Sequence, residues 1–154
     1  RAPLPGGGTC CNGAQWEPGR VLVESVDPFH MTSVDYFEAW GREPVERIAR
    51  RFDGAVLHLH GNGRHLLASA ATLAGVKSIL LGDDAGFPPA FQVLPGLRRL
   101  AGDMPLAVAV GAADFVAALD AHRLTGGVLY YVGGLPDAET ANRLMDRVRA
   151  YRAD

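Results

Sequence analysis

The chain has 154 residues, of which 48% are hydrophobic, and its 15 basic and 17 acidic residues give a formal net charge of −2. This length and composition suit one globular domain with an adequate core. The balanced charge argues against a nucleic-acid-binding protein, and no apolar stretch approaches the roughly 20 residues that span a bilayer. The N-terminus also lacks the charged start and apolar core of a signal peptide. We therefore expect a soluble, cytoplasmic protein with no nucleic-acid or membrane partner.

The opening segment, residues 1–19, is rich in Gly and Pro and has neither helical nor strand periodicity. It is predicted to be a loop that precedes a folded domain over 20–154, and its start at Arg1 suggests a piece of something longer. Cys10 and Cys11 are neighbours, which strains a mutual disulfide, so free thiols are expected. The alternative is that one thiolate joins histidines on a zinc ion.

The remaining chain alternates between short apolar runs and stretches with helical spacing. A short strand is predicted over 20–26, followed by a helix that Ser33 caps and that runs to about Arg51. Four more strands are predicted at 55–60, 76–82, 105–111 and 127–134. Helices are predicted at 64–74, 89–102, 113–124 and 139–152, with Pro95 interrupting the second. This α/β alternation indicates a parallel sheet with right-handed crossovers.

Four to five such βα units are about half of an eight-unit (β/α)8 barrel. Half a barrel leaves two strand edges unpaired. Three arrangements solve that problem: an N-terminal half outside this sequence, a second chain, or an open sheet with helices on both faces. The first is the expected one.

Two histidines end the first of these four strands, within AVLHLHGNGRHLL at 55–67. His58 and His60 are two residues apart, so they share one face of the strand and can converge on one metal ion or substrate group. The alternative is that both are hydrogen-bonded polar residues at the rim of the sheet. His30 and His65 are expected at the surface, and His122 late in a helix, where the dipole favours it.

The turn that follows, Gly61, Asn62 and Gly63, exposes backbone N–H groups before a helix. It can hold a carboxylate or phosphate of a substrate, with Arg64 as the one obvious cation beside it. The alternative is a tight turn that needs glycine because of a positive φ.

Asp83 and Asp84 follow the next strand and place two carboxylates at the same rim. They are candidate catalytic groups or a third zinc ligand, with a helix N-cap as the alternative. Tyr130 and Tyr131 alternate in the last strand, so one is expected to line the pocket, and Tyr131 is the candidate. Its hydroxyl can donate a hydrogen bond to a substrate, although a role in the core is the alternative.

Three pieces carry a family resemblance over residues 16–152: the WxPG segment at 16–19, the strand ending in HxHGNG, and the last strand running into GGLPxxET. In this order and spacing the chain resembles the C-terminal half of the uroporphyrinogen decarboxylase superfamily, which includes cobalamin-dependent methyltransferases. The resemblance implies a TIM-type barrel with its site at the carboxyl ends of the strands.

The two branches of that superfamily need different residues at this site. In the methyltransferases, the resemblance implies a zinc ion held by a His-x-Cys-Gly segment and a later Cys. His58 matches the first ligand and Gly61 the glycine, whereas His60 stands where the Cys is expected and Gly133 where the later Cys is expected. The decarboxylases carry a histidine in a GHG-like turn, and that position also falls on Gly133. The sequence therefore departs from both patterns at Gly133.

The leading hypothesis is metal-assisted methyl transfer from a corrinoid to a thiol, with zinc held by His58 and His60. The alternatives are decarboxylation of a porphyrinogen and a non-catalytic tetrapyrrole-binding or assembly module. The implied partners are a small thiol or a tetrapyrrole, a corrinoid protein, and a second chain or N-terminal half that completes the barrel.

Overall fold

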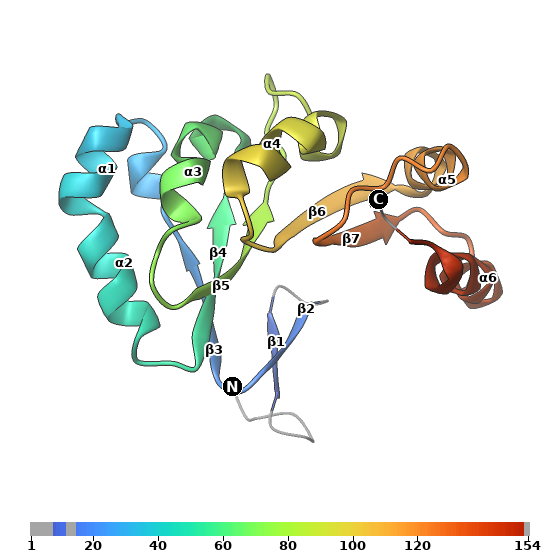
Figure 1. The fold of residues 1–154 in the computed structure, drawn as a ribbon, viewed down its shortest axis with the longest axis horizontal. Helices are drawn as coiled ribbons and strands as arrows, with labels where there is room; N and C mark the ends of the chain where they lie inside the picture. The colour runs from blue at the N-terminus through green and yellow to red at the C-terminus, as the bar shows by residue number, and fades with distance from the viewer. Residues whose placement is uncertain (1–7, 12–14, 153–154) are drawn as a thin grey trace.

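A computed structural model describes residues 8–11 and 15–152, and its main feature is a five-stranded parallel sheet (Figure 1). The strands follow one another in chain order as β3-β4-β5-β6-β7. Their bounds are Val21–Ser25, Gly54–Leu59, Val76–Leu81, Leu106–Gly111 and Val128–Gly133. Each predicted strand is confirmed, because short apolar runs closed by Gly or polar residues leave little freedom in where a buried strand begins and ends.

Six α-helices and three 3₁₀-helices connect the strands in the described part of the chain. The α-helices are α1 (Val34–Trp40), α2 (Arg42–Ala49), α3 (Leu67–Ala70), α4 (Leu94–Ala101), α5 (Ala112–Asp120) and α6 (Ala138–Ala150). The 3₁₀-helices are η1 (Asp27–Phe29), η2 (Gly61–Leu66) and η3 (Ala90–Val93). As predicted, Ser33 caps α1 by accepting a hydrogen bond from the backbone N–H of Tyr36.

Four local predictions need correction. The helix expected over 33–51 divides at Gly41 into α1 and α2, and the one expected over 64–74 consists of η2 and the single turn of α3. Pro95 stands in the first turn of α4, where its missing N–H costs nothing, so it begins that helix after η3. The segment 1–19 is not a loop throughout: β1 (Gly8–Cys11) pairs antiparallel with β2 (Gln15–Pro18).

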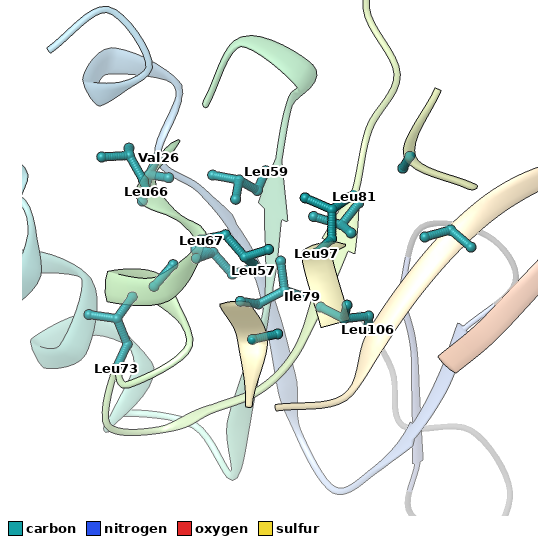
Figure 2. Packing of buried hydrophobic residues seen from close by; sticks show 14 of the residues in the cluster. Val26, Leu57, Leu59, Leu66, Leu67, Leu73, Ile79, Leu81, Leu97 and Leu106 are labelled. Carbon is teal, nitrogen blue, oxygen red and sulfur yellow. The ribbon is translucent and has the colours of Figure 1, made fainter. Parts of the chain in front are cut away.

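The core lies between the helices and one face of the sheet. Figure 2 shows strand residues such as Leu57, Ile79 and Leu106 pointing at helix residues such as Leu67 and Leu97. A second cluster, which contains Val110, Phe115, Leu119 and Leu144, joins the same face to α5 and α6. Alternate strand residues are apolar and face the helices, as the pleat requires.

The opposite face, here called the open face, carries the other residues of each strand. Its buried cluster consists of strand residues alone, Val21 and Val56 with Leu80 packed against them. Farther along, Leu129 is 45% exposed and Ala109 is exposed. In the described residues, sequential strand order with the helices on one face excludes the open sheet with helices on both faces. The observed architecture is a partial, barrel-like α/β fold.

Among the described residues, no helix is both long enough and apolar enough to cross a membrane.

Candidate functional site

The two strand-end histidines lie together, as their spacing predicts. His58 is in β4, in register with Ser25 of β3 and Leu80 of β5, and His60 follows the strand at the start of η2. Their ring centroids are 4.4 Å apart. Gly82, after β5, makes room for the pair, since a Cβ there would lie 2.8 Å from His58 Nε2 and 3.5 Å from His60 Nδ1.

Asp84 joins this pair from the loop after β5. Its Oδ1 lies 2.9 Å from His60 Nδ1, and its Oδ2 accepts a hydrogen bond of 3.2 Å from the backbone N–H of Asn62. The hydrogen bond with His60 is the main reason that the pKa of Asp84 lies below its usual value, and the Asn62 bond adds to it against partial burial. Asp84 is therefore an ionised carboxylate that fixes the His60 ring with Nε2 directed away from it.

Asp83 has a different role from its neighbour. Its Oδ1 accepts a hydrogen bond of 2.7 Å from the backbone N–H of Ala90, at the start of η3, and lies 3.0 Å from Arg64 Nη2. Arg64 also donates to the carbonyl oxygens of Gly82, at 3.0 Å, and Pro88. Asp83 thus binds the first backbone N–H of η3 and the Arg64 guanidinium, which is held by protein oxygens.

Asp27 and His30 lie on and directly after η1, and they join His58, His60 and Asp84 in what is here called the histidine cluster. The sequence analysis did not predict either residue as part of the site. His30 was expected at the surface but is 5% exposed, with its ring centroid 5.7 Å from that of His60. Asp27 Oδ1 lies 3.5 Å from His30 Nδ1 and 3.9 Å from His60 Nε2. Burial lowers the pKa of His30, against the opposing effect of Asp27, so its imidazole is neutral at pH 7. The available signal was that η1 follows the carboxyl end of β3, the same edge at which His58 stands.

The Gly61–Gly63 turn is built for close packing, and the positive φ expected there is not found, since neither glycine is among the left-handed residues. A Cβ at Gly63 would lie 2.2 Å from His30 Cδ2, and one at Gly61 would lie 3.3 Å from Asp84 Oδ2. Both glycines let the backbone approach the cluster.

The two tyrosines of β7 divide as the alternation predicts. Tyr130 packs among Phe91 and Phe115 on the helix side, and its hydroxyl donates a hydrogen bond of 2.8 Å to Thr125 O. Burial raises the pKa of Tyr130. Tyr131 is paired in register with Ala109 and lies with His58 around a cavity on the other side.

The remaining histidines lie outside the cluster. His65 is exposed, and its Nε2 lies 2.8 Å from Thr32 O. His122 was expected inside a helix, but it follows α5 with a φ of 52°, and its ring contacts that of Tyr151 at 4.6 Å between centroids with a tilt of 37°.

The histidine pair stands between two hollows. A polar cleft of about 370 Å³ lies on the His60 side and is lined by Asp27, His30, His60, Asn62, Asp84, Ala85 and Phe87. A more apolar cavity of about 270 Å³ lies on the His58 side and is lined by His58, Leu80, Leu81, Gly82, Asp83, Ala109 and Tyr131. Gly133 ends β7 opposite Gly111 and offers no side chain to either.

The two imidazoles of His58 and His60 are suitable zinc ligands, but they are fewer than a zinc site needs. Burial, with a smaller effect of His60, lowers the pKa of His58, and neutral imidazole is the form that binds metal. A catalytic zinc site has three protein ligands. Across residues 8–11 and 15–152, no group of three or more His, Cys, Asp or Glu side chains is placed to hold a metal ion. The side chains of Cys10 and Cys11 lie outside what the structure describes.

No protein-family model, curated protein or solved structure matches this chain significantly.

Proposed function

We propose that this chain is part of a barrel enzyme of the uroporphyrinogen decarboxylase superfamily, and that its His58–His60 site prepares a thiol to accept a methyl group from a corrinoid. The sequential parallel strands and one-sided helices support the barrel, because each further βα unit extends such a sheet in the same sense. On this proposal, βα units beyond the five described ones, or a second chain, close the barrel over the open face.

One observation carries the assignment of the reaction centre. Two imidazoles and a carboxylate, His58, His60 and Asp84, meet at the carboxyl ends of adjacent parallel strands, where barrel enzymes hold their catalytic groups. His60 is oriented by Asp84 as metal-binding and catalytic histidines are oriented by a second carboxylate. A zinc ion on His58 and His60 would lower the pKa of a bound thiol, with its third ligand supplied from outside the described residues.

The remaining contacts suit a thiol and a flat methyl donor. Leu80, Ala109 and Tyr131 give the His58 side an apolar surface on the open face. Neither hollow is large enough to enclose a corrinoid, so the corrinoid approaches across that face, carried by a partner protein.

Decarboxylation of a porphyrinogen has weaker support. Its acidic side chains need cationic partners, yet neither hollow of the described site is lined by Lys or Arg. Arg64, the one cation beside the turn, is occupied by Asp83 and two carbonyl oxygens.

The test is methyl transfer from methylcobalamin to small thiols, followed by the cobalt absorbance and by mass spectrometry of the thioether. Activity is expected in zinc-loaded protein, and His58→Ala and His60→Ala are expected to abolish both product and zinc binding. His65→Ala removes an exposed histidine outside the cluster and is expected to change neither.

Three results would overturn the proposal. A corrinoid spectrum that shifts without product identifies a binding module instead. Release of CO₂ from a porphyrinogen identifies a decarboxylase. Methyl transfer that survives the loss of both histidines places the reaction centre elsewhere.

A further inference from the structure

The parallel sheet ends in two free strand edges. In the described part of the chain, the order β3-β4-β5-β6-β7 leaves β3 and β7 with a paired strand on one side only. The β1–β2 hairpin contacts β3 but forms a separate sheet, and it reaches toward β5, where Lys77 Nζ lies 3.5 Å from Pro18 O. Each free edge carries backbone N–H and C=O groups that a further strand can bind.

The edge strand β7 lacks the features that protect a strand from pairing with another chain. Val128–Gly133 contains no charged residue and no proline, and its register with β6 is continuous. Leu129 of this strand is 45% exposed on the open face. Edge strands of monomeric proteins usually carry a charge, a proline or a bulge that prevents such pairing. The β7 edge is therefore a surface suited to strand pairing.

The register of the sheet is that of a closed ring of strands. A row of paired residues that starts at Ser25, the last residue of β3, reaches Leu129, the second residue of β7. Because β7 continues to Gly133, the strands are displaced by four residues over the four steps from β3 to β7. Closed α/β barrels have the same stagger, roughly one residue per strand. The two free edges are therefore matched to each other in direction and in stagger.

The helices add an apolar surface at the β3 end of the sheet. Glu38 of α1 and Arg42 of α2 both contact Ser69 of α3, so the polar side of α1 and α2 faces the next helix of the layer. By helical spacing the opposite side carries Tyr36 and Trp40, which are 52% and 67% exposed, with ring centroids 6.5 Å apart. Among the described residues, no helix lies beyond α1 and α2 at this end (Figure 1). Exposed Tyr and Trp side chains are typical of protein interfaces.

We infer that the β7–α6 end of this chain binds the β3–α1 end of a second copy, and that this contact forms twice about a two-fold axis. The inference names the second chain of the proposed function and rests on its barrel, but not on its reaction. β7 pairs with β3 of the partner, and a right-handed crossover brings α6, with the exposed Met145, over the junction toward Tyr36 and Trp40 of the partner. Two sheets of five strands then close into one ring, with the open face and His58 inside it.

The first experiment measures the mass of the 154-residue chain by sedimentation equilibrium at increasing concentration, and twice the mass of one chain is expected. Val23→Glu and Leu129→Glu each place a charge on the open face of an edge strand, at positions that are exposed in a single chain. Each is expected to weaken the dimer at least about a hundredfold, because the charge enters both contacts. Leu100→Glu, exposed on α4 away from both ends, is the control and is expected to remain a dimer. A single-chain mass at every concentration, or a Val23→Glu chain that stays dimeric, would overturn the inference.

A mixture of two variants tests which edges meet. The Val23→Lys chain and the Leu129→Glu chain are each expected to be single in isolation but to form a mixed pair. In that pair one β7–β3 contact is unchanged, and the other combines the two opposite charges. Pairing of β7 with β7 predicts instead that the Val23→Lys chain dimerises by itself, a result that would refute the inference.

Hydrogen exchange tests the same contact in the unchanged chain, where no variant has to fold. Amide exchange in β3 and β7 is expected to slow as the protein concentration rises, because both edges become paired in the dimer. Exchange in β4, which is paired on both sides in a single chain, is expected to change less. Exchange in β3 and β7 that does not depend on concentration would count against the contact.

The methyl-transfer assay, run on the same preparations, separates this inference from the proposed reaction. A dimer that methylates no thiol keeps the interface and refutes the reaction. Methyl transfer by a single chain refutes the interface and keeps the reaction.

Discussion

Replacing Gly63 by alanine tests whether His30 is packed tightly against the backbone of the Gly61–Gly63 turn. A Cβ at this position would lie 2.2 Å from Cδ2 and 2.5 Å from Nε2 of His30. The His30 side chain is only 3% exposed, so the ring has no free space to turn into. Overpacking of this kind costs about 1–3 kcal/mol of unfolding free energy. For a chain of this length each kcal/mol lowers the melting temperature by roughly 2–4 °C.

The matched control is a second glycine-to-alanine change, which is expected to raise the unfolding free energy instead of lowering it. Gly96, in α4, has no atom within 4 Å of its ideal Cβ, so Gly96→Ala is expected to stabilise the protein by up to about 1 kcal/mol. Both variants are compared with the unchanged chain by urea unfolding and heat unfolding at pH 7.

A double-mutant cycle examines the cause. His30→Ala should remove the clash, so Gly63→Ala is expected to cost at least about 1 kcal/mol less in that background. An unchanged cost of Gly63→Ala with the ring absent would refute the packing argument, as would a Gly63→Ala protein as stable as the original.

Three further predictions concern stability. The hydrogen bonds from Arg42 and, to a smaller extent, Ser69 lower the pKa of Glu38 from 4.5 to about 2. Glu38→Gln should therefore lower the unfolding free energy above pH 5, and the difference from the unchanged chain, measured by urea unfolding, should narrow as the pH falls to 3. A difference that stays constant over this pH range would contradict the prediction. Burial lowers the pKa of His30 below 6.5. The unfolded chain therefore binds a proton at a higher pH than the folded chain does, so the protein becomes less stable as the pH drops from 7.5 to 5.5. The melting temperature of His30→Gln should fall less than that of the unchanged chain over this range, and an equal fall would count against burial as the cause. Tyr130→Phe removes the 2.8 Å hydrogen bond to Thr125 O and should lower the unfolding free energy by about 1 kcal/mol, measured by urea unfolding. An unchanged unfolding free energy would show that this hydrogen bond contributes nothing to stability.

The sheet could be predicted from the sequence because its signals are local. Apolar runs of about six residues, each followed by a helical pattern, determine parallel strands and their order. The same reasoning placed His58 and Tyr131 on one face, since alternation along a strand decides orientation. Short elements were harder: η2 and the β1–β2 pairing have no clear period, and tertiary packing decides them.

Three of the five side chains in the cluster could be predicted in this way. His58, His60 and Asp84 come directly at or after strand ends and carry their own signal. Asp27 and His30 lie about 30 residues earlier in the chain, and a lone histidine in a loop gives no indication that it will be buried. The position of η1 directly after β3 brings both residues to the carboxyl edge of the sheet, but the burial of His30 there depends on tertiary packing.

The strictly sequential order of the strands has a consequence for how the molecule opens. Each βα unit contacts chiefly its neighbours, as repeats do in a solenoid, so stability is a sum of local interfaces. The two large hydrophobic clusters follow one another along the sheet. One joins α1–α4 to β4–β6, and the other joins α5 and α6 to β6 and β7. Phe91 and Tyr130 contact both clusters. The β7–α6 end can therefore unfold locally while the histidine cluster stays folded. Amide hydrogen exchange should be faster in β7 than in β4.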